Sequence, residues 1–461
     1  MKPIQISDIV AATGGTLLCG NSEDYVSAVC TDTRKLTKGA LFVPLSGERF
    51  DAHDFICDAL AGGCSSSLTS RRDASADKTL IFVEDTKRAL GALAAWYRRQ
   101  FNIPLVAITG SVGKTIVKEL TAAVLATKLN VLKTAGNFNN EIGLPLTLFR
   151  LEDSHEVAIT EMGMSGFGEI DALAAMAVPD IGIVTNIGLS HIEMLGTQEN
   201  IYKAKSELFR HIKPGGTVII NGDDPILSSH LRDIGHKTVT VGLTPSCDLT
   251  ATDICSQADH LSFSVIYGNQ KVPVILSFPG EHNVTNALLA CAAGLCLGIS
   301  LEEGARGLAS YEPADRRMQL INISGITIIN DCYNAAPASI EAALRVLCTQ
   351  KGRKFAVLGD IKELGEHTKP AHEQIGRFAA TLSLDGLLTL GDHAKWIAHG
   401  AKEAGMPPEK IQIFDDMIAL NVAIGKLLMT GDTVLVKASR AMRLERVTEF
   451  IETKFTKELK S

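Results

Sequence analysis

The segment 104–119, PLVAITGSVGKTIVKE, constrains the fold of this chain most. Residues 105–109 are apolar or nearly so, which predicts a strand of a parallel sheet, buried on both faces. A glycine loop of four residues follows at 110–113, and a helical pattern then begins at Lys114 and Thr115. A strand, a glycine loop and a helix in this order are the context that a phosphate-binding loop requires.

The loop predicts an anion site. Backbone N–H groups of such a loop point inward, and the N-terminus of the following helix adds positive partial charge. Lys114 would reach the β- and γ-phosphates of a nucleotide, and the Thr115 hydroxyl would ligate Mg²⁺. Ile108 stands where the common pattern G-x-x-x-x-G-K-[ST] has its first glycine, so an ordinary strand–helix turn that carries Gly-Lys-Thr is the alternative. The predicted cofactor-binding residues of the loop are Gly110, Ser111, Val112, Gly113, Lys114 and Thr115.

Composition argues against several other classes of protein. At 461 residues the chain is too long for one hydrophobic core, so two or three domains are expected. A net charge of −7 without a long basic run argues against nucleic acid as the main partner. The ten cysteines are scattered without a C-x-x-C motif, which suits free thiols in a reducing cytoplasm. The longest uncharged apolar stretch, 287–299, is too short to span a membrane, and residues 1–20 lack the apolar core of a signal peptide.

Alternation of strand and helix patterns predicts an α/β fold with three domains. Residues 1–82 indicate a small α/β domain with a strand at 41–45. Residues 83–312 indicate a central domain whose parallel sheet carries the phosphate loop, and 313–461 a Rossmann-like, doubly wound C-terminal domain. The strands predicted in the last two domains are 105–109, 157–160, 181–185, 217–221, 261–267, 272–278, 326–329, 355–358, 387–390, 411–414 and 433–436.

Polar residues follow several of these strands, at the sheet edge where parallel α/β sheets bind ligands. Glu161 follows the strand at 157–160 and would hold Mg²⁺ opposite Thr115, because Mg²⁺ prefers hard oxygen ligands. A solvated carboxylate at a strand end is the alternative. His191 follows another strand end, where a metal or phosphate role and a structural role are equally open.

Other polar residues fit a solvated surface as well as a function. Lysines on one predicted helix, 202–209, indicate a solvated face. A polar loop of the first domain, for which composition favours solvation, contains Asp32, Arg34, Arg49 and His53.

Three more groups leave two interpretations open. Asn283 and Asn286 open a helix, either as caps or as amides that recognise a base. Arg316 and Arg317 lie at the domain junction, where they would close on phosphates or form an interdomain salt bridge. The basic cluster 437–443 follows a strand end, where it either receives an anion or is solvated.

Nine segments have a recognisable combination of residues: TGSVGKT at 109–115, NFNNEIGLPLTL at 137–148, EMGM at 161–164, NIGLSHIEMLG at 186–196, KAKSELF at 203–209, GEHNVTNALLA at 280–290, NDCYNAAPAS at 330–339, VLGDIKELGE at 357–366 and VKASRAMRLE at 436–445. Together they resemble the Mur ligase family over essentially the whole chain. The segment 31–55 resembles the domain that holds the UDP-sugar end of the substrate. The segment 137–148 is typical of the member that adds a dipeptide.

The resemblance implies an ATP-dependent amide ligase of peptidoglycan precursor synthesis. ATP would phosphorylate the terminal carboxylate of UDP-N-acetylmuramoyl-tripeptide, and the amine of D-Ala-D-Ala would attack the acyl phosphate. Carboxylate and γ-phosphate are both anions, so metal ions and cationic groups must screen them. The implied cofactors are ATP and two Mg²⁺ ions, and the implied enzyme is a cytoplasmic monomer without a nucleic acid partner or a membrane span.

The resemblance also implies a catalytic and metal-binding set. Thr115 and Glu161 would hold the first Mg²⁺, and Glu161, His191 and a carbamylated lysine the second. Alignment on A-K-x-x-[LI]-F places that lysine at Lys205 rather than Lys203, and a carbamate would convert its amine into an oxygen ligand. The implied catalytic residues are Lys114, Glu161, His191 and Lys205.

Further roles follow from the same resemblance. Asn283 would face the adenine, Arg317 the γ-phosphate and Asp331 the ribose. The residues implied in binding the UDP-muramoyl-tripeptide or the dipeptide are Asp32, Arg34, Arg49, Asn137, Asn139, Asn140, Tyr333, Asn334, Ser439 and Arg440. Ala336 stands where the family tends to have Asn, which bears on one polar contact near the ribose or the dipeptide and not on the reaction class.

The alternatives are a sister ligase that adds one amino acid to the same nucleotide-sugar peptide, or a folylpolyglutamate synthase-like ligase that adds glutamate to folate. The segment 137–148 and the lack of an Asp-Asn-Pro-Arg tetrapeptide favour the dipeptide-adding type. An inactive binding protein with the same fold is the alternative from another class, against which Lys114, Thr115, Glu161 and His191 argue.

Overall fold

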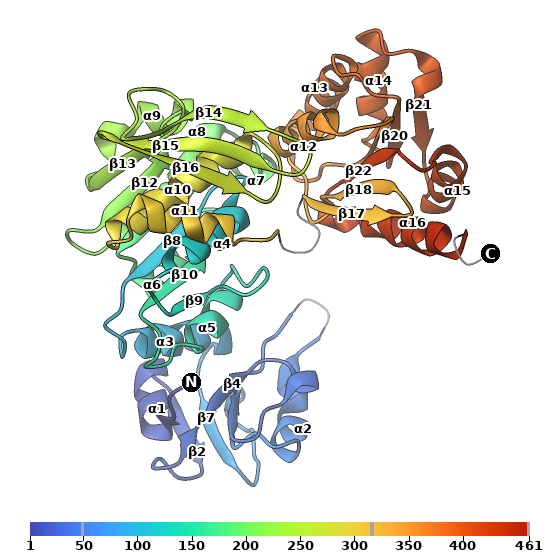
Figure 1. Ribbon diagram of the computed structural model, residues 1–461. Helices are drawn as coiled ribbons and strands as arrows, with labels where there is room; N and C mark the ends of the chain where they lie inside the picture. Colours follow the sequence, from blue (N-terminus) through green and yellow to red (C-terminus); the bar gives the residue numbers. More distant parts are fainter. Residues whose placement is uncertain (48–49, 314–317, 459–461) are drawn as a thin grey trace. The chain divides into compact units, whose positions relative to one another are not determined.

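The computed structural model describes residues 1–47, 50–313 and 318–458 (Figure 1). Helices connect the strands of its sheets, so the predicted α/β class is confirmed. Contacts along the chain divide it into two compact units. Unit 1 consists of Met1–Thr109, Lys128–Ile183 and Ala204–Val218, and unit 2 of Gly110–Thr127, Val184–Lys203 and Ile219–Ser461.

Unit 1 begins with a five-stranded sheet. The elements up to residue 82 are β1 (Ile4–Gln5), α1 (Ile6–Thr13), β2 (Thr16–Cys19), β3 (Tyr25–Val26), β4 (Ala28–Cys30), η1 (Thr33–Lys35), β5 (Ala40–Phe42), η2 (Ala52–Phe55), α2 (Ile56–Ala61), β6 (Ser66–Thr69) and β7 (Thr79–Phe82). β1 and β3 form a separate antiparallel pair. The strand order is β2-β7-β6-β5-β4, with β4 to β7 parallel. The strand predicted at 41–45 ends earlier, at Phe42, which packs with Ile56 and Leu80 in one core cluster.

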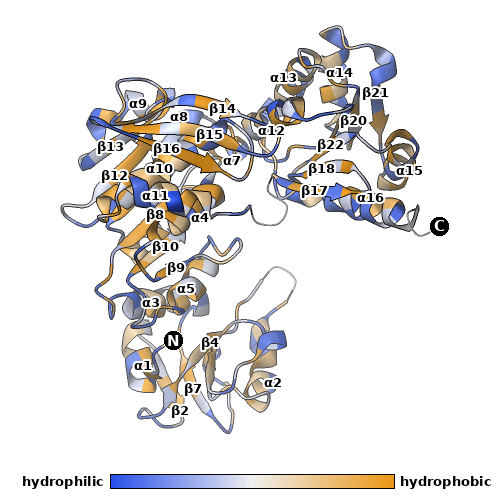
Figure 2. Ribbon diagram, in the orientation of Figure 1, coloured by the Kyte–Doolittle hydropathy of each residue, from blue (hydrophilic) through white to orange (hydrophobic). Residues whose placement is uncertain are grey.

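The strand that leads into the glycine loop lies in a second sheet of unit 1. The elements here are α3 (Thr86–Arg98), β8 (Leu105–Thr109), β9 (Val131–Lys133), α5 (Gly143–Leu148), β10 (Val157–Glu161), α6 (Glu169–Ala177), β11 (Ile181–Val184) and η3 (Glu207–His211). The order is β11-β8-β10-β9, and β10 pairs in parallel with both β8 and β9. All five residues of β8 are buried, as its apolar run predicts. Figure 2 shows hydrophobic residues over much of these strands.

Unit 2 begins with the helix behind the glycine loop. The elements that lie wholly or mostly in it, up to residue 309, are α4 (Lys114–Leu125), α7 (Ile192–Leu195), α8 (Gln198–Ser206), β12 (Thr217–Asn221), α9 (Pro225–Ser229), η4 (Leu231–Asp233), β13 (Lys237–Val241), β14 (Leu249–Ser256), β15 (Leu261–Tyr267), β16 (Gln270–Leu276), α10 (His282–Cys296) and α11 (Leu301–Ala309). β14, β15 and β16 are antiparallel neighbours, which accounts for the shorter strand patterns after residue 245. α4 packs on α10 and α11. Gly307 allows this approach, since a Cβ there would overlap the Ala123 carbonyl.

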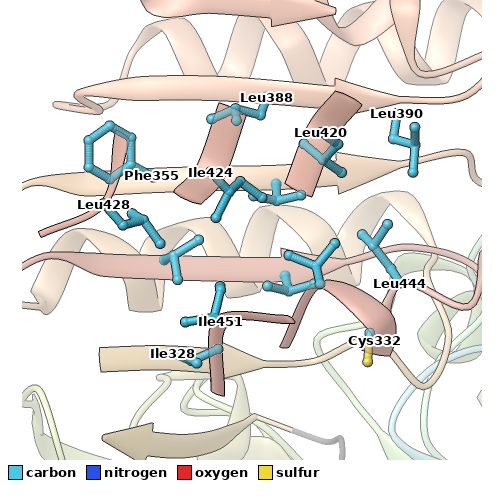
Figure 3. Packing of buried hydrophobic residues seen from close by; sticks show 14 of the residues in the cluster. Ile328, Cys332, Phe355, Leu388, Leu390, Leu420, Ile424, Leu428, Leu444 and Ile451 are labelled. Carbon is cyan, nitrogen blue, oxygen red and sulfur yellow. The ribbon is translucent and has the colours of Figure 1, made fainter. Parts of the chain in front are cut away.

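The C-terminal part of unit 2 has a six-stranded sheet in the order β17-β18-β22-β19-β20-β21. Its elements are β17 (Gln319–Ile323), β18 (Ile326–Asn330), α12 (Pro337–Thr349), β19 (Lys354–Gly359), η5 (Gly365–His367), α13 (Thr368–Ala380), β20 (Gly386–Leu390), α14 (Lys395–Glu403), η6 (Pro408–Lys410), β21 (Ile411–Phe414), α15 (Met417–Leu427), β22 (Thr433–Lys437), η7 (Arg440–Met442) and α16 (Glu445–Glu458). All neighbours except β17 and β18 are parallel, as the doubly wound pattern predicts. Phe355, Leu388, Leu420 and Ile451 belong to the apolar core that joins this sheet to its helices (Figure 3).

Among the residues described, no helix has both the length and the apolar character to cross a membrane.

Candidate nucleotide and metal site

The glycine loop begins where β8 ends, and two of its residues must be glycine. Gly110 has φ 146°, and a Cβ there would overlap the Thr185 hydroxyl. Gly113 has φ 87° and is the residue before α4; a Cβ there would lie 2.9 Å from Asn286 Oδ1. Side chains at either position would therefore be strained or would collide with a neighbour.

Asn186, which follows β11, holds the centre of the loop. Its backbone carbonyl accepts from Ser111 N at 3.0 Å, and its side-chain oxygen accepts from Val112 N at 2.9 Å. Its Nδ2 donates to the Val112 carbonyl at 3.0 Å, which also accepts from the Thr185 hydroxyl at 2.5 Å. Gly188 N donates to Ser111 Oγ at 2.8 Å. The loop is thus shaped by the residues after a neighbouring strand, and the amides of Ser111 and Val112 donate to Asn186.

Lys114 lies over the loop that precedes it. Its Nζ donates to the Gly110 carbonyl at 2.7 Å and to the Ser111 carbonyl at 3.3 Å. The ammonium and the N-terminus of α4 together make this end of the loop positive, which suits an anion. Thr115, in the first turn of α4, is buried.

Glu161 lies at the carboxyl end of β10, in register with Ile108 of β8. Its side chain is buried, with the residue 2% exposed, and Oε1 accepts from Asn139 Nδ2 at 2.9 Å. The alternative of a solvated carboxylate is therefore wrong, and Asn139, from the segment 137–148, contacts the acid. The side chain of the neighbouring Asn140 accepts from Ile142 N and Gly143 N, just before and at the start of α5.

The two lysines of α8 differ sharply in their surroundings. Lys205 is 1% exposed, whereas the Lys203 side chain is 59% exposed and pairs with Glu199 at 3.9 Å. Glu207, at the start of η3, accepts from the backbone N–H groups of Gly168 and Asp171 at the N-terminus of α6. The interpretation of the helix as a solvated face therefore holds for Lys203 and fails for Lys205.

His191 precedes α7 with a left-handed backbone, φ 65°. Its Nδ1 lies 2.6 Å from Oε2 of Glu363, a residue of the loop after β19. The hydrogen bond with His191 holds the pKa of the Glu363 carboxyl below its usual range, so this acid is ionised at neutral pH.

The residues predicted for adenosine have partners inside the protein. Asn283 is buried; its Nδ2 donates to the Pro279 carbonyl, and its Oδ1 accepts from Asn286 Nδ2 at 3.0 Å. Neither residue caps α10. Asp331 pairs with the buried Lys437 at 2.5 Å, and Lys437 also donates to the Asn334 carbonyl at 3.1 Å. Lys437 thus fixes the segment that contains Asp331, Tyr333 and Asn334.

Ser439 and Arg440 follow β22. Ser439 Oγ accepts from Lys362 N at 2.9 Å, and Lys362 donates from Nζ to the buried Asp360 at 2.8 Å. Arg440 pairs with Glu445 at 2.8 Å. Lys362 also lines a cavity of about 640 Å³, together with Glu193, Lys369, His393 and Trp396.

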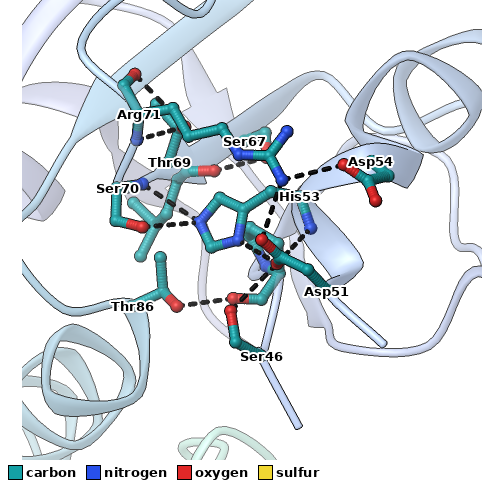
Figure 4. Close-up of polar contacts among 11 residues, drawn as sticks. Ser46, Asp51, His53, Asp54, Ser67, Thr69, Ser70, Arg71 and Thr86 are labelled. Atoms are coloured by element: carbon teal, nitrogen blue, oxygen red, sulfur yellow. Dashed lines mark hydrogen bonds and ion pairs between the residues drawn. The ribbon is translucent and has the colours of Figure 1, made fainter. Parts of the chain in front are cut away.

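The polar loop of the first domain forms a network around His53 (Figure 4). Ser70 N donates to His53 Nε2 at 3.1 Å, so the ring hydrogen lies on Nδ1 and is donated to Asp51 at 2.6 Å. Burial would raise the pKa of Asp51, but hydrogen bonds from His53, Arg71 and Ser46 hold it well below its usual range. His53 is buried, so the solvated-loop interpretation is wrong for it.

Asp32 and Arg34 remain at the surface. Asp32 accepts from Arg34 N, Nε and Nη2, and these hydrogen bonds lower its pKa to about 2. The exposed fraction of the Arg34 side chain is 87%, which fits either a solvated loop or a surface that receives a ligand. Arg49 and Arg317 lie outside the described residues.

The predicted magnesium ligands supply suitable donors. No group of three His, Cys, Asp or Glu side chains that could hold a metal occurs within 1–47, 50–313 and 318–458. The predicted set draws on other types as well: the Thr115 hydroxyl, the Glu161 carboxylate, the His191 imidazole and, after carbamylation, an oxygen of Lys205. Hydroxyl, carboxylate and carbamate are the hard oxygen donors that Mg²⁺ prefers.

Sequence reasoning missed two contacts of this region. The Asn186 side chain shapes the loop, and Glu363 reaches His191. The only signal for either was its place after a strand end, because neither contact joins residues close together in the sequence.

Two family descriptions match the chain. Residues 108–294 match "Mur ligase middle domain", and 316–440 match "Mur ligase, glutamate ligase domain". A Bacillus subtilis (strain 168) protein, UDP-N-acetylmuramoyl-tripeptide–D-alanyl-D-alanine ligase, is 37% identical over 96% of this chain and 97% of its own length. The chain belongs to the Mur ligase family.

Solved structures of the same family have the same fold as this chain. A crystal structure of MurF from Acinetobacter baumannii superposes with a TM-score of 0.92 at 33% identity, covering 98% of this chain and all of the other. The MurF ligase of Thermotoga maritima in complex with ADP superposes with a TM-score of 0.85 at 30% identity, covering 94% of this chain and 99% of that one. The likeness includes the N-terminal residues, which neither family description matches.

Proposed function

We propose that this protein is an ATP-dependent ligase that joins D-Ala-D-Ala to UDP-N-acetylmuramoyl-tripeptide in peptidoglycan precursor synthesis. The observation that carries the proposal is the glycine loop 110–115, held at the N-terminus of α4 with Lys114 folded onto it. The relatives supply the substrate class, since proteins that match almost the full chain have the name of this ligase. The ADP complex of the Thermotoga maritima relative supports ATP as the phosphoryl donor.

The reaction takes place in two steps. A carboxylate oxygen of the tripeptide attacks the γ-phosphorus, the bond from that phosphorus to the β–γ bridging oxygen breaks, and ADP leaves. The dipeptide amine then attacks the acyl carbon, loses a proton to solvent, and phosphate leaves with its bridging oxygen as the amide forms. The loop and Lys114 bind and orient the triphosphate, and such orientation accounts for much of the rate of a reaction of this kind.

Magnesium is part of the proposal. Thr115, Glu161, His191 and a carbamylated Lys205 would hold two Mg²⁺ ions. When bound, Mg²⁺ neutralises charge on the phosphates as carboxylate and γ-phosphate approach. The burial of Glu161 and Lys205 supports their assignment, because a buried carboxylate and a buried amine are rare without a specific role.

The domain roles follow from the same assignment. Residues 1–82 would bind the UDP-muramoyl end with Asp32, Arg34 and Arg49, 83–312 would bind ATP, and 313–461 the incoming dipeptide. The cavity beside Lys362 supports the last role, since the backbone N–H of Lys362 donates to Ser439 and the cavity is lined by cationic, aromatic and acidic side chains.

The remaining assignments are proposals of the same kind. Asn137, Asn139 and Asn140 would contact the peptide end of the substrate or the phosphate region, and Tyr333, Asn334 and Arg440 the other substrates. Asn283, Arg317 and Asp331 would bind the nucleotide. The enzyme would act as a cytoplasmic monomer; ten free cysteines support a reducing compartment.

Phosphate release from ATP is expected to require both UDP-muramoyl-tripeptide and D-Ala-D-Ala, because the acyl phosphate forms on one and is consumed by the other. The measurement is phosphate release with each substrate omitted, then with D-Ala-D-Ala replaced by single amino acids, and with folate plus glutamate. Equal phosphate release with a single amino acid would show that the protein is a sister ligase. Equal release with folate and glutamate would show that it is a folylpolyglutamate synthase. Tripeptides containing lysine or diaminopimelate, compared in the same assay, identify the third residue.

A further inference from the structure

Two segments of unit 2 that lie far apart in the sequence meet at His191. The loop 361–365 lies on the start of α7: Glu193 N donates to the Glu363 carbonyl at 3.3 Å, and a Cβ on Gly365 would lie 3.3 Å from Glu193. At the centre of this contact, His191 Nδ1 is 2.6 Å from Glu363 Oε2. The Glu363 side chain therefore reaches the imidazole directly.

Both residues of the pair have a backbone conformation that side chains disfavour. His191 and Glu363 each have φ 65°, in the left-handed region. Residues other than glycine enter this region only at an energetic cost, because the Cβ approaches the following carbonyl oxygen. Such strain persists where the surrounding structure imposes it, and it is concentrated at functional sites. His191 and Glu363 are two of seven non-glycine residues with positive φ in the described part of the chain, and their side chains are in contact.

The contact decides which ring nitrogen of His191 is available. Glu363 Oε2, 2.6 Å from Nδ1, accepts the hydrogen bond of this contact, so the ring hydrogen lies on Nδ1. The lone pair is then on Nε2. A carboxylate that holds one nitrogen of a metal-binding histidine fixes its tautomer and orientation, and makes the other nitrogen a better ligand.

We infer that Glu363 is a positioning residue for His191: its carboxylate orients the imidazole and keeps Nε2 as the metal-binding nitrogen. The inference rests on the proposed function, in which His191 is a magnesium ligand. The opposite role, in which Glu363 keeps His191 away from a metal, predicts tighter metal binding when the carboxylate is removed.

The test is the binding of Mn²⁺ to the full-length protein with a non-hydrolysable ATP analogue, followed by the electron paramagnetic resonance signal of free Mn²⁺. Glu363→Ala is expected to weaken Mn²⁺ binding about 10- to 100-fold. Glu363→Gln is expected to have a smaller effect, because its amide oxygen still accepts from Nδ1. In the rate assay, Glu363→Ala raises the Mg²⁺ concentration needed for half-maximal rate, while kcat recovers at saturating Mg²⁺.

Glu403 provides a matched control. It too lies near a histidine, with His399 Nδ1 at 3.7 Å, and its side chain is 54% exposed against 58% for Glu363. Glu403→Ala should leave Mn²⁺ binding unchanged, and neither substitution should lower the melting temperature much, because both side chains are half exposed. Nitrogen-15 NMR of the ring, assigned with His191→Gln, should show the Nδ1–H tautomer in the wild type and its loss in Glu363→Ala.

The outcomes separate this inference from the proposed function. Unchanged or tighter Mn²⁺ binding in Glu363→Ala would overturn the positioning role. If the wild type failed to ligate D-Ala-D-Ala while Glu363→Ala still weakened Mn²⁺ binding, the proposed substrate would be wrong and the role of Glu363 would stand.

Discussion

Lys205→Ala is expected to lower the ligase rate at least about a thousandfold, whereas Lys203→Ala should leave it within about twofold of the wild type. The two lysines are two residues apart on α8, and only Lys205 is buried. A thousandfold loss corresponds to about 4 kcal/mol, the scale of charge stabilisation that a metal ion supplies to a transition state. Lys203 forms an exposed pair with Glu199, and such pairs are worth at most about 1 kcal/mol.

The measurement is the rate of phosphate release at saturating substrates for both variants. A short-chain carboxylic acid should partly restore Lys205→Ala, because it would supply the oxygen ligand that a carbamate otherwise provides. Melting temperature and binding of a nucleotide analogue check that the variant is folded, and Lys205→Met is a second variant that fills more of the space. An inactive Lys203→Ala beside an active Lys205→Ala would place the metal-binding lysine two residues earlier.

Lys114→Ala is expected to reduce kcat/KM for ATP by a factor of about 10²–10³. The ammonium donates to two carbonyls of the loop, so it lies on the segment to which the triphosphate is assigned. Removing one preorganised donor from a charged transition state costs about 3–4 kcal/mol, which gives this factor. The half-buried position of Lys114 suggests a modest change in stability.

The assay is the ATP dependence of phosphate release with both other substrates saturating. Lys128→Ala is the matched control, since Lys128 is exposed and lies beyond the end of α4. Lys114→Arg should recover little, because a planar guanidinium does not reproduce the geometry of an ammonium. A loss of less than tenfold in Lys114→Ala would argue against the assignment of the loop to the triphosphate.

Much of the sheet architecture could be predicted from local sequence. The apolar run of β8 and the strands β12, β15 and β21 lie where their patterns place them, because a buried strand needs a continuous or alternating apolar run. The observed C-terminal ends of β5 and β16 lie two or three residues before the ends predicted from the sequence. The short strands of the first domain gave weaker patterns, because each has only two to four residues.

The side-chain partners could not be predicted in the same way. Asn186 reaches Val112 across 74 positions, and Glu363 reaches His191 across 172; nothing in either local pattern specifies the partner. The structure shows that Lys205 is buried and Lys203 exposed, and that His53 is buried within a polar loop. The sequence could not predict this, because the burial of a single polar residue produces no periodic pattern. The role of Lys205 itself came from the family resemblance and remains a prediction that burial supports.

In the proposed reaction, the loop positions ATP so that its γ-phosphoryl group passes to a carboxylate of the tripeptide. The most direct measurement uses UDP-muramoyl-tripeptide with both oxygens of its terminal carboxylate replaced by ¹⁸O, followed by mass spectrometry of the phosphate released. The acyl-phosphate route predicts one ¹⁸O atom in each phosphate, because the bridging oxygen leaves with phosphorus when the amine attacks. Phosphate without ¹⁸O, formed at the same rate as the amide, would contradict the account.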